Sequence, residues 1–445
     1  MPARNLVWVL IVATIALLLW NGPDVIARRE TVYELFSPLV DVRAEIHKRY
    51  VEEVDDAVLM RGAVEGMLHS LDPFSTYLSP DDYPRFKQHQ AGKFGGIGIE
   101  VGLKNGVLTV ISPMENTPAF RAGILADDRI LEIDGESTDR MTLADAVQKL
   151  MGAPGSQVTL KVFHTLTDQT ETLSITRAQI EVASVLGWQR DGDNQWDYWL
   201  DRENKIAYVR LSGFLDTTAA ALNQVMQKLL DEGAEALVMD LRFNPGGSLT
   251  AAVAVADRFL SSGTIVSVRG RWRAEEVYKA NREDTLPDFP MVVLVNEQSA
   301  SGAEIVAGAL RDHERAVVIG KRTYGKGSVQ EVIELGAGNS AIKLTTAYYY
   351  LPNGELIHRT AASRQTGKWG VEPNITVDLT NEEIQQVFES RMAADRISGA
   401  TTRPVASAPA RPLIDKQLGK ALEVLRAKLA KSEPAPKAVA SRPAA

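Results

Sequence analysis

The spacing of hydrophobic residues changes twice along the chain and predicts three structural regions. From about residue 30 to residue 69, apolar side chains recur every three or four positions, as in Val32, Leu35, Phe36 and Leu39, and this spacing predicts helices. The prolines of "LDPFSTYLSPDDYP" end the helical pattern. We therefore expect a helical N-terminal region over residues 30–90.

From about residue 93 the hydrophobic period shortens to two and glycine becomes frequent, which predicts short strands bounded by turns. Two short helices are expected between the strands, closed by Gly123 and Gly152. The five predicted strands are "GKFGGIGIEV", "GVLTVISP", "DRILEIDG", "SQVTLKVF" and "ETLSITR". Together these elements predict a small compact module over residues 91–180.

After Ala183 strands and helices alternate. The runs "ALVMDL" and "MVVLVN" are continuously apolar, which is typical of buried strands. Helices are expected over about residues 217–232 and in "LTAAVAVADRFL" and "SASGAEIVAGALRD". This alternation predicts an α/β core over residues 181–379.

Regular structure is expected to decline beyond residue 379. We predict a helical region over residues 380–432, and a tail over residues 433–445 that is rich in Pro and Ala and is expected to be disordered. The apolar positions of one amphipathic helix in that region are Ile414, Leu418, Leu422, Leu425 and Leu429.

The N-terminal segment, residues 1–29, contains an uncharged apolar run from Leu6 to Trp20. A run of this length fits a secretory signal and is short for a full membrane span. We favour an uncleaved signal-anchor, with a cleaved signal peptide as the alternative. Both export the remainder of the chain, so we expect an extracytoplasmic protein of the cell envelope, anchored to the inner membrane.

Charge and cysteine content narrow the function classes. The 445 residues carry a formal net charge of −8, which argues against a general nucleic-acid binder. The chain has no cysteine, so disulfides, thiolate nucleophiles and cysteine zinc sites are excluded.

The stretch "GKRTYGKGS", residues 320–328, resembles a phosphate-binding loop but has Gly327 where Ser or Thr is required. Such a loop must open a helix, whose N-terminus binds the phosphate. Here the following residues, "SVQEVIELGAG", have the pattern of a strand. A role for Lys326 other than nucleotide binding is therefore favoured.

Ser301 lies between a predicted buried strand and a helix. The simplest interpretation is a capping box with Glu304, but a serine at this position is also well placed for nucleophilic attack. The sequence leaves its base open: His313 lies about three turns along the helix from Ser301, and no pattern argues against His358. A lysine also serves as a base if its pKa is lowered to about 7–8, and burial away from carboxylates lowers it. Lys326 has no acidic neighbour before Glu331, although an exposed turn lysine is the alternative.

The segment "DLRFNPGGS" begins at the end of another predicted buried strand. A tight turn explains its glycines. In a functional interpretation, the N–H groups of Gly246 or Gly247 bind an oxyanion. Three strand-end motifs on one sheet would then supply a nucleophile, a base and an oxyanion hole.

With these motifs the chain resembles the carboxy-terminal processing peptidases, a family of serine endopeptidases with a serine–lysine dyad and an embedded PDZ domain. The resemblance covers about residues 30–379. It rests on "LDPFSTYLSP", "FGGIGIEV", "SPMENTPAFRAGILADDRILEIDG", "DLRFNPGG", "SASGAEI" and "TYGKGSVQ". It implies a multidomain α/β fold, in which a core of crotonase- or Clp-protease-like ββα units carries an inserted PDZ domain and helical terminal segments.

The resemblance also implies roles for individual residues. Ser301 corresponds to the nucleophile and Lys326 to the general base. Their separation of 25 residues matches the spacing in the family, which Ser299 fits less well. Gln330 corresponds to a glutamine that orients the lysine, and Asp312 to an acidic position sometimes linked to activity. The implied oxyanion donors are Gly302, where the family often has Ala, and one of Gly246 and Gly247, with Gly246 slightly favoured. Phe243 occupies a position at which the family frequently has a polar residue.

A PDZ domain adds a peptide as an extra strand and holds its terminal carboxylate with backbone amides. Here those donors would be Gly96, Ile97 and Gly98, with an apolar terminal side chain between Ile99 and the helix over residues 143–150. The implied substrates are proteins with apolar C-terminal tails. Self-association through the terminal helices and an adaptor lipoprotein are also implied, and neither a metal nor another cofactor is needed. The alternative is a catalytically silent scaffold that only binds tails.

Overall fold

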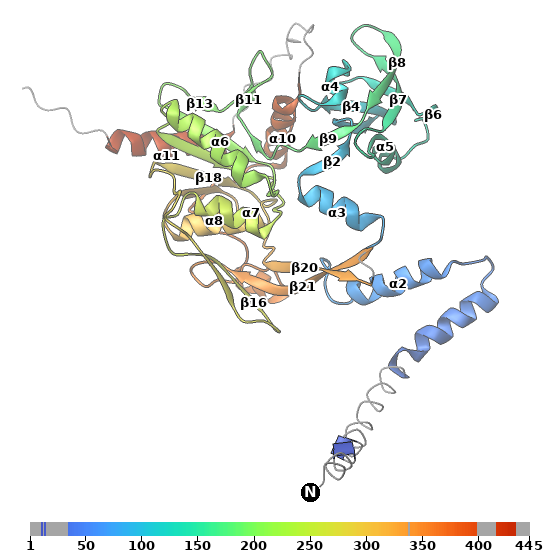
Figure 1. Ribbon diagram of the computed structural model, residues 1–445. Coiled ribbons are helices and arrows are strands. Elements are labelled where there is room, and N and C mark those ends of the chain that lie inside the picture. Colours follow the sequence, from blue (N-terminus) through green and yellow to red (C-terminus); the bar gives the residue numbers. More distant parts are fainter. Residues whose placement is uncertain (1–9, 12, 15–33, 337–338, 398–414, 433–445) are drawn as a thin grey trace, which may run out of the picture.

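The computed structural model describes residues 10–11, 13–14, 34–336, 339–397 and 415–432. The N-terminal region forms a helix over residues 34–49 and α2 (Asp56–His69), which extend away from the body of the molecule (Figure 1). Most of the predicted signal-anchor and the whole tail over residues 433–445 lie outside the described residues. Within the described ranges, no helix is both long and apolar enough to cross a membrane.

The core is built on a seven-stranded sheet, and the predicted α/β alternation is confirmed. Helices α6 (Thr218–Asp231), α7 (Leu249–Asp257) and α8 (Gly302–Asp312) pack on one face, and α11 (Lys416–Ser432) packs on the other. The sheet order is β10 (Val185–Leu186), β14 (Ile206–Leu211), β15 (Ala236–Asp240), β18 (Met291–Val295), β19 (Val317–Gly320) and β22 (Ile375–Thr376), with β13 (Trp199–Asp201) also beside β14.

A second sheet lies below this core in Figure 1. Of its strands, only β20 was predicted from the sequence. Its unexpected member is β1, which comes from the N-terminal "LDPFSTYLSP" motif and pairs with β21. The order is β1 (Thr76–Leu78), β21 (Ser340–Tyr350), β16 (Thr264–Gly270) and β17 (Glu276–Lys279), with β20 (Ser328–Leu335) also paired to β21.

The small module contains a six-stranded sheet of β3 (Ile99–Lys104), β4 (Val107–Pro113), β5 (Arg129–Ile133), β6 (Glu136–Ser137), β7 (Gln157–His164) and β8 (Gln169–Thr176), with α4 (Pro118–Arg121) and α5 (Leu143–Leu150). The predicted strand "GKFGGIGIEV" is instead two strands. Its first half, β2 (Lys93–Gly96), pairs with β9 (Ala178–Glu181), whereas β3 forms the edge of the module's sheet.

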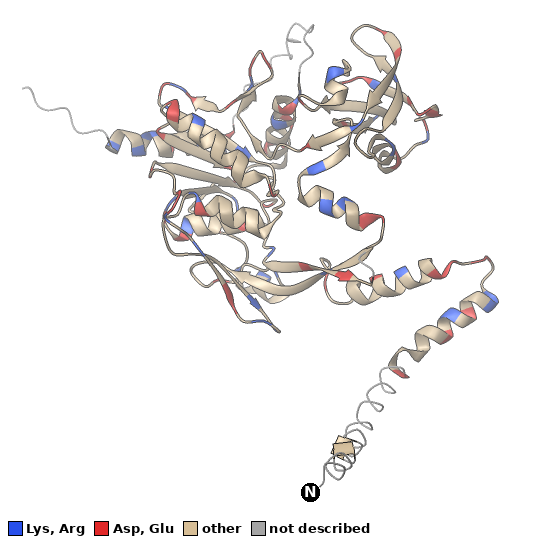
Figure 2. Cartoon of the chain, in the orientation of Figure 1, with Lys and Arg blue, Asp and Glu red and all other residues tan. Residues whose placement is uncertain are grey.

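The remaining helices are α3 (Asp82–Gln90), α9 (Ala361–Thr366) and α10 (Asn381–Asp395), and the hairpin strands are β11 (Gln189–Arg190) and β12 (Trp196–Asp197). Helix α10 lies between the core and the small module (Figure 1). Acidic and basic side chains are distributed over all parts of the fold (Figure 2). In the predicted C-terminal helix, Leu418, Ala421 and Leu425 are buried against the central sheet, whereas Ile414 lies outside the described residues.

Candidate active site

Ser301 immediately precedes α8, at the end of the loop that follows β18. Its backbone has φ 53° and ψ −114°, a conformation that costs a residue with a side chain about 1–3 kcal/mol and persists only when the surroundings enforce it. Ser299 is instead fully buried, and its hydroxyl donates to the carbonyl of Leu241 over 2.8 Å. The structure therefore gives Ser299 a structural partner and leaves Ser301 as the candidate nucleophile.

A buried carboxylate holds Ser301 and Lys326 together. Glu304 is fully buried, and its Oε2 accepts the backbone N–H of Ser301 and that of Lys326, each over 2.8 Å. Its Oε1 accepts the N–H of Gly325 over 2.7 Å and the hydroxyl of Thr323 over 2.5 Å. Burial raises the pKa of Glu304 to about 6, although these hydrogen bonds oppose the increase. The carboxylate thus fixes the start of α8 against the loop before β20.

Tyr349 on β21 makes a second link between the same two residues. Its hydroxyl donates to the carbonyl of Ser301 over 3.1 Å and also contacts the carbonyl of Lys326. The ring is fully buried. Burial raises the pKa of this phenol well above its usual value, so the hydroxyl remains a donor at physiological pH.

The Lys326 side chain is partly buried. Burial lowers the pKa of Lys326, and the nearby charge of Lys343 lowers it further, whereas Glu304 opposes the change. The Nζ atom lies 4.9 Å from the centroid of the Phe74 ring, which belongs to the N-terminal motif before β1. No ion pair to Lys326 occurs within the described ranges. Burial and the charge of Lys343 therefore favour the neutral amine that a lysine base requires, whereas the Phe74 ring and Glu304 favour the ammonium.

Gln330 and Asp312, the other expected participants, have hydrogen-bond or ion-pair partners other than Ser301 and Lys326. Gln330 donates its amide N–H to Ser328 Oγ and Thr345 Oγ1, and no hydrogen bond from it to Lys326 occurs among the residues that the structure describes. Asp312 pairs with Arg311 at the far end of α8, about 16 Å along the helix axis from Ser301.

Of the two histidines considered as alternative bases, His313 lies far from Ser301, and His358 makes no hydrogen bond to Ser301 among the described residues. The backbone of His358 packs on Gly327, and its ring lies 5.0 Å from that of Tyr348. Burial lowers the pKa of His358. His313 hydrogen-bonds to the carbonyl of Thr264, beyond the opposite end of α8 from Ser301.

The loop of residues 244–247 lies directly against Ser301. A Cβ atom on Gly246 would come within 2.6 Å of Ser301 Cβ and 2.8 Å of Gly302 N. However, the N–H of Gly246 already donates to Asn244 Oδ1 over 2.8 Å. Among described residues, no acceptor is found for the N–H groups of Gly247 and Gly302. The N–H groups of Gly247 and Gly302 are therefore free to donate, whereas that of Gly246 already has an acceptor.

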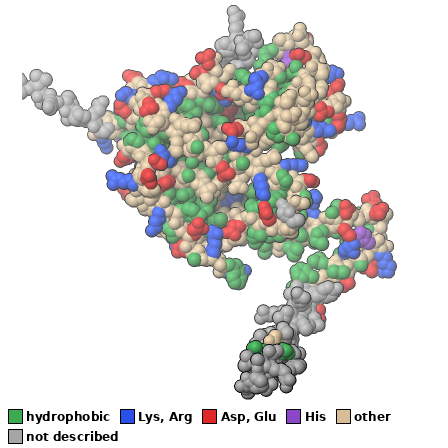
Figure 3. All heavy atoms as spheres, viewed as in Figure 1, with side chains coloured by type: hydrophobic (Ala, Val, Ile, Leu, Met, Phe, Trp, Pro, Cys, Tyr) green, Lys and Arg blue, Asp and Glu red, His purple; other side chains and the backbone are tan. Residues whose placement is uncertain are grey.

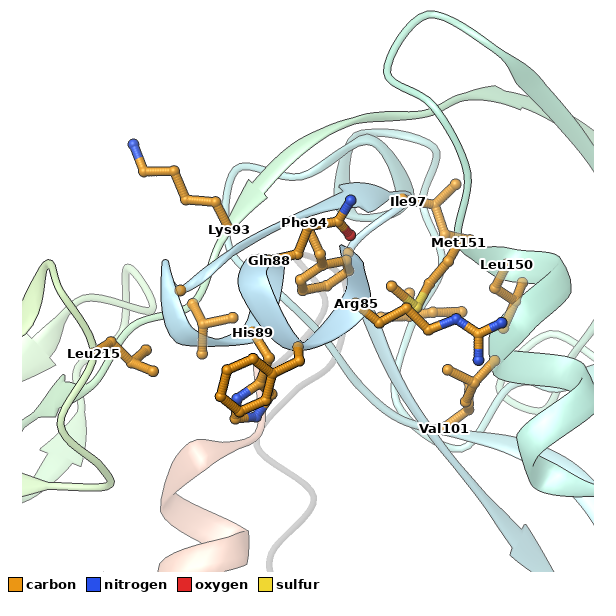
Figure 4. Close-up of a pocket in the computed structure, with 17 residues that line it drawn as sticks. Arg85, Gln88, His89, Lys93, Phe94, Ile97, Val101, Leu150, Met151 and Leu215 are labelled. Atoms are coloured by element: carbon orange, nitrogen blue, oxygen red, sulfur yellow. The ribbon is translucent and has the colours of Figure 1, made fainter. Parts of the chain in front are cut away.

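The small module contains an apolar groove of about 550 Å³. Ile97, Ile99 and Val101 line it from the β3 side, and Val147 and Leu150 line it from α5. Helix α3 forms another wall, from which Arg85 extends toward Val101 and Leu150 (Figure 4). Leu215, which follows the segment paired with Gly247, also lines the cavity.

The three residues expected to bind a carboxylate line this groove. Gly96 is the last residue of β2, whereas Ile97 and Gly98 lie between β2 and β3. The carbonyl of Ile97 accepts from Ala119 N, and that of Gly98 accepts from Met114 N. These bonds fix the turn, and a Cβ on Gly98 would come within 2.4 Å of Thr117.

Sequence reasoning identified Glu304 only as a helix cap and missed Tyr349 and Phe74. The spacing between Ser301 and Glu304 was a usable signal for Glu304. Tyr349 and Phe74 act across long sequence separations, and no local pattern marks them.

Comparisons with known proteins agree with this architecture. Residues 205–377 match the family described as "Peptidase family S41", residues 109–162 match "PDZ domain", and residues 28–81 match "Activating protease CtpB N-terminal domain". Among solved structures, the photosystem II D1 C-terminal processing protease is 30% identical, with a TM-score of 0.44, over 76% of this chain and 86% of that one.

Curated relatives carry the same assignment over greater lengths. The carboxy-terminal-processing protease of Bartonella bacilliformis is 35% identical over 90% of each chain. The carboxy-terminal processing protease CtpA of Bacillus subtilis is 34% identical over 77% of this chain and 69% of its own. The chain therefore belongs to the carboxy-terminal processing proteases, serine-type peptidases of family S41 that carry a PDZ domain.

Proposed function

We propose that Ser301 and Lys326 form a catalytic dyad that cleaves peptide bonds through an acyl-enzyme. The observation that carries this proposal is the pair of equal hydrogen bonds from the two backbones to one oxygen of Glu304. They bring a serine at a helix N-terminus next to a lysine whose pKa is lowered by burial.

In the proposed reaction, neutral Lys326 accepts the hydroxyl proton as Ser301 Oγ attacks the carbonyl carbon of the substrate. The N–H groups of Gly302 and Gly247 bind the oxyanion of the tetrahedral intermediate. The ammonium of Lys326 then donates its proton to the leaving amine, and water, activated by the same lysine, hydrolyses the ester. Gln330 has a supporting role in this scheme, through its bonds beside the loop.

The PDZ groove selects the substrate in this proposal. Strand β3 lies at the edge of its sheet, so an extended tail can pair with it. The tail's carboxylate would meet the N–H groups at Gly96, Ile97 and Gly98, and its apolar terminal side chain would enter the cavity beside Ile99. The substrates are thus proteins with apolar C-terminal tails.

The N-terminal region supports proposals on location and assembly. We propose that residues 1–29 direct export and hold the enzyme at the inner membrane, where an adaptor lipoprotein can present substrates. We also propose that the N-terminal helices mediate self-association. Their apolar side chains are exposed over the helix of residues 34–49 and over α2 (Figure 3), among them Leu35, Phe36, Val40, Val58 and Met60.

The decisive experiment expresses the Ser301→Ala variant in cells, isolates it with bound proteins and determines their C-termini. Trapped proteins with apolar C-termini that disappear in cells with the active enzyme would support the proposal. Purified parent that binds such tails but cleaves no loosely folded substrate would instead favour the silent scaffold.

A further inference from the structure

The apolar groove beside β3, which we call the tail groove, is not built by the PDZ domain alone. Helix α3, which belongs to the N-terminal region, forms one of its walls, and Leu215 of the core lines it as well. Residues from three parts of the chain therefore meet around one cavity. The contacts proposed above for a bound tail all belong to the PDZ domain, which leaves α3 without a role.

The ionisable side chains around the tail groove are all of basic types. Arg85, His89 and Lys93 line it, and none of its lining residues, all of which lie within the described ranges, is Asp or Glu. The chain as a whole carries a net charge of −8, so a wall without acidic residues is not a consequence of its composition. An anionic group in a bound tail would meet no like charge on this wall.

Arg85 is the member of this set that faces the interior of the groove. Its side chain extends toward Val101 of β3, whereas that of Lys93 extends away from the groove (Figure 4) and pairs with Glu181 over 2.6 Å. The ion pair of Arg85 with Asp82, on the same helix, spans 3.9 Å between side chains that are 51% and 54% exposed. Such a pair contributes little stability, so the guanidinium can exchange it for a carboxylate of the tail.

The backbone that carries Arg85 is fixed on both sides. At the start of α3, the hydroxyl of the buried Tyr83 donates to Glu334 of β20 over 2.5 Å. Just beyond the end of the helix, the carbonyl of Gly92 accepts the N–H of Val182 over 2.9 Å. Arg85 therefore projects from an anchored helix, and only its side chain has to adapt to a ligand.

The place of Arg85 along the tail groove indicates which part of a tail it meets. A tail that ends at residues 96–98, just before β3, must run antiparallel to β3, so its upstream residues pass Val101. Ile99 and Val101 both line the groove and lie about 7 Å apart along the strand. Arg85 is therefore placed beside a side chain about one to three residues before the C-terminus, rather than beside the terminal carboxylate.

We infer that Arg85 selects tails in which an acidic side chain precedes the apolar C-terminal residue by one to three positions. Its guanidinium and the carboxylate of the tail form a charge-assisted hydrogen-bonded pair, and the apolar wall beside them reduces screening by water. A basic residue at the same position is disfavoured. The inference rests on the proposed binding of apolar tails and deepens it, because it adds a charged residue to the class of substrates.

The test measures Kd by fluorescence anisotropy for labelled peptides that share one apolar C-terminus and carry Asp, Ala or Lys one, two or three positions before it. The protein is the full chain with Ser301→Ala, so that bound peptides are not cleaved. We expect the best Asp peptide to bind about three- to tenfold more tightly than its Ala counterpart, and the Lys peptide to bind more weakly. Arg85→Gln should remove the difference between Asp and Ala and leave Kd for the Ala peptide unchanged. Arg85→Glu should reverse the order of Asp and Lys.

The matched control is Arg140→Glu, which changes an exposed arginine of the PDZ domain that does not line the tail groove and should keep the preference for Asp. Equal affinity for the Asp and Ala peptides before Arg85 is changed, or an Arg85→Glu variant that still prefers Asp, would overturn the inference alone. An equal loss for both peptides in Arg85→Gln would place the guanidinium at the terminal carboxylate and overturn it as well. Failure of every apolar-tailed peptide to bind would instead overturn the proposed tail recognition.

Discussion

Ser301 and Lys326 donate their backbone N–H groups to the same oxygen of Glu304, each over 2.8 Å. The two nitrogens can therefore be no farther apart than twice that distance, although 25 positions separate the residues in sequence. Tyr349 joins their carbonyls from the other side. Two buried side chains thus hold the backbones of these two residues next to each other.

The two serines of "SASGAEI" should respond differently to substitution. Ser301→Ala should abolish cleavage while tail binding, measured by fluorescence anisotropy, is retained. Ser299→Ala removes a buried hydroxyl that is hydrogen-bonded, so it should lower the unfolding free energy by about 1–3 kcal/mol and keep activity per folded molecule. Cleavage by Ser301→Ala would exclude it as the nucleophile.

The activity should increase with pH as Lys326 loses its proton. The charge of Lys343 lowers the pKa of Lys326, so Lys343→Gln should move the pH–rate midpoint to higher pH and reduce activity severalfold at neutral pH. Lys368→Gln, at an exposed site, is the matched control. Lys326→Ala should be folded and inactive, and a rate that declines above neutrality in the parent would contradict lysine as the base.

Glu304 should affect both catalysis and the pH dependence of stability. Its pKa is raised from 4.5 to about 6, so the native state binds more protons than the unfolded state between these values. Its contribution to stability is present below pH 4.5 and is lost as pH rises through 6, a change of about 2 kcal/mol. Glu304→Gln should remove this change from denaturation curves. It should also reduce kcat, because an amide NH2 cannot accept the N–H groups that the carboxylate binds.

Two glycines beside Ser301 should differ in their tolerance of a methyl group. Gly246→Ala places Cβ 2.6 Å from Ser301 Cβ at φ 96°, and we expect kcat to fall about 100-fold. In Gly302→Ala the nearest atom is Phe214 Cδ2 at 3.0 Å and the backbone has no positive φ. A displacement of a few tenths of an ångström relieves this contact, so kcat should remain within severalfold of the parent. Steady-state kinetics of both variants provide the comparison, and equal losses would contradict the assigned geometry.

The tail groove can be tested at Val147, which is 38% exposed. A charged side chain there would face the apolar cavity, so Val147→Asp should weaken binding of an apolar tail peptide at least about tenfold. Val277→Asp, at a similarly exposed valine on β17, should leave Kd unchanged. Calorimetry with the same peptide measures both, and unimpaired binding by Val147→Asp would place the tail elsewhere.

Local patterns predicted most of the core and the small module, because buried parallel strands and amphipathic helices have strong periodicity. The strands around Ile206, Leu237 and Val292 and the helices between them were recognisable for this reason. The break at Ile97 was not, since only the pairing of β2 with β9 separates the two halves of "GKFGGIGIEV".

The candidate site could be predicted where a motif marks its chemistry, as at Ser301, Lys326 and the double glycine. The choice between Gly246 and Gly247 depended on one side-chain acceptor, Asn244 Oδ1, which sequence does not locate. Phe74 and Tyr349 reach the site through pairing of β1 and β20 with β21, and such long-range pairing leaves no local signal.

The pairing of β1 with β21 limits where the N-terminal region can be shortened. A cut before Asp72 would release the projecting helices and leave the edge strand in place. A cut after Leu78 would remove three ladder positions together with the aromatic ring over the lysine amine. Maturation by proteolysis is thus compatible with an active enzyme only on the N-terminal side of this short strand.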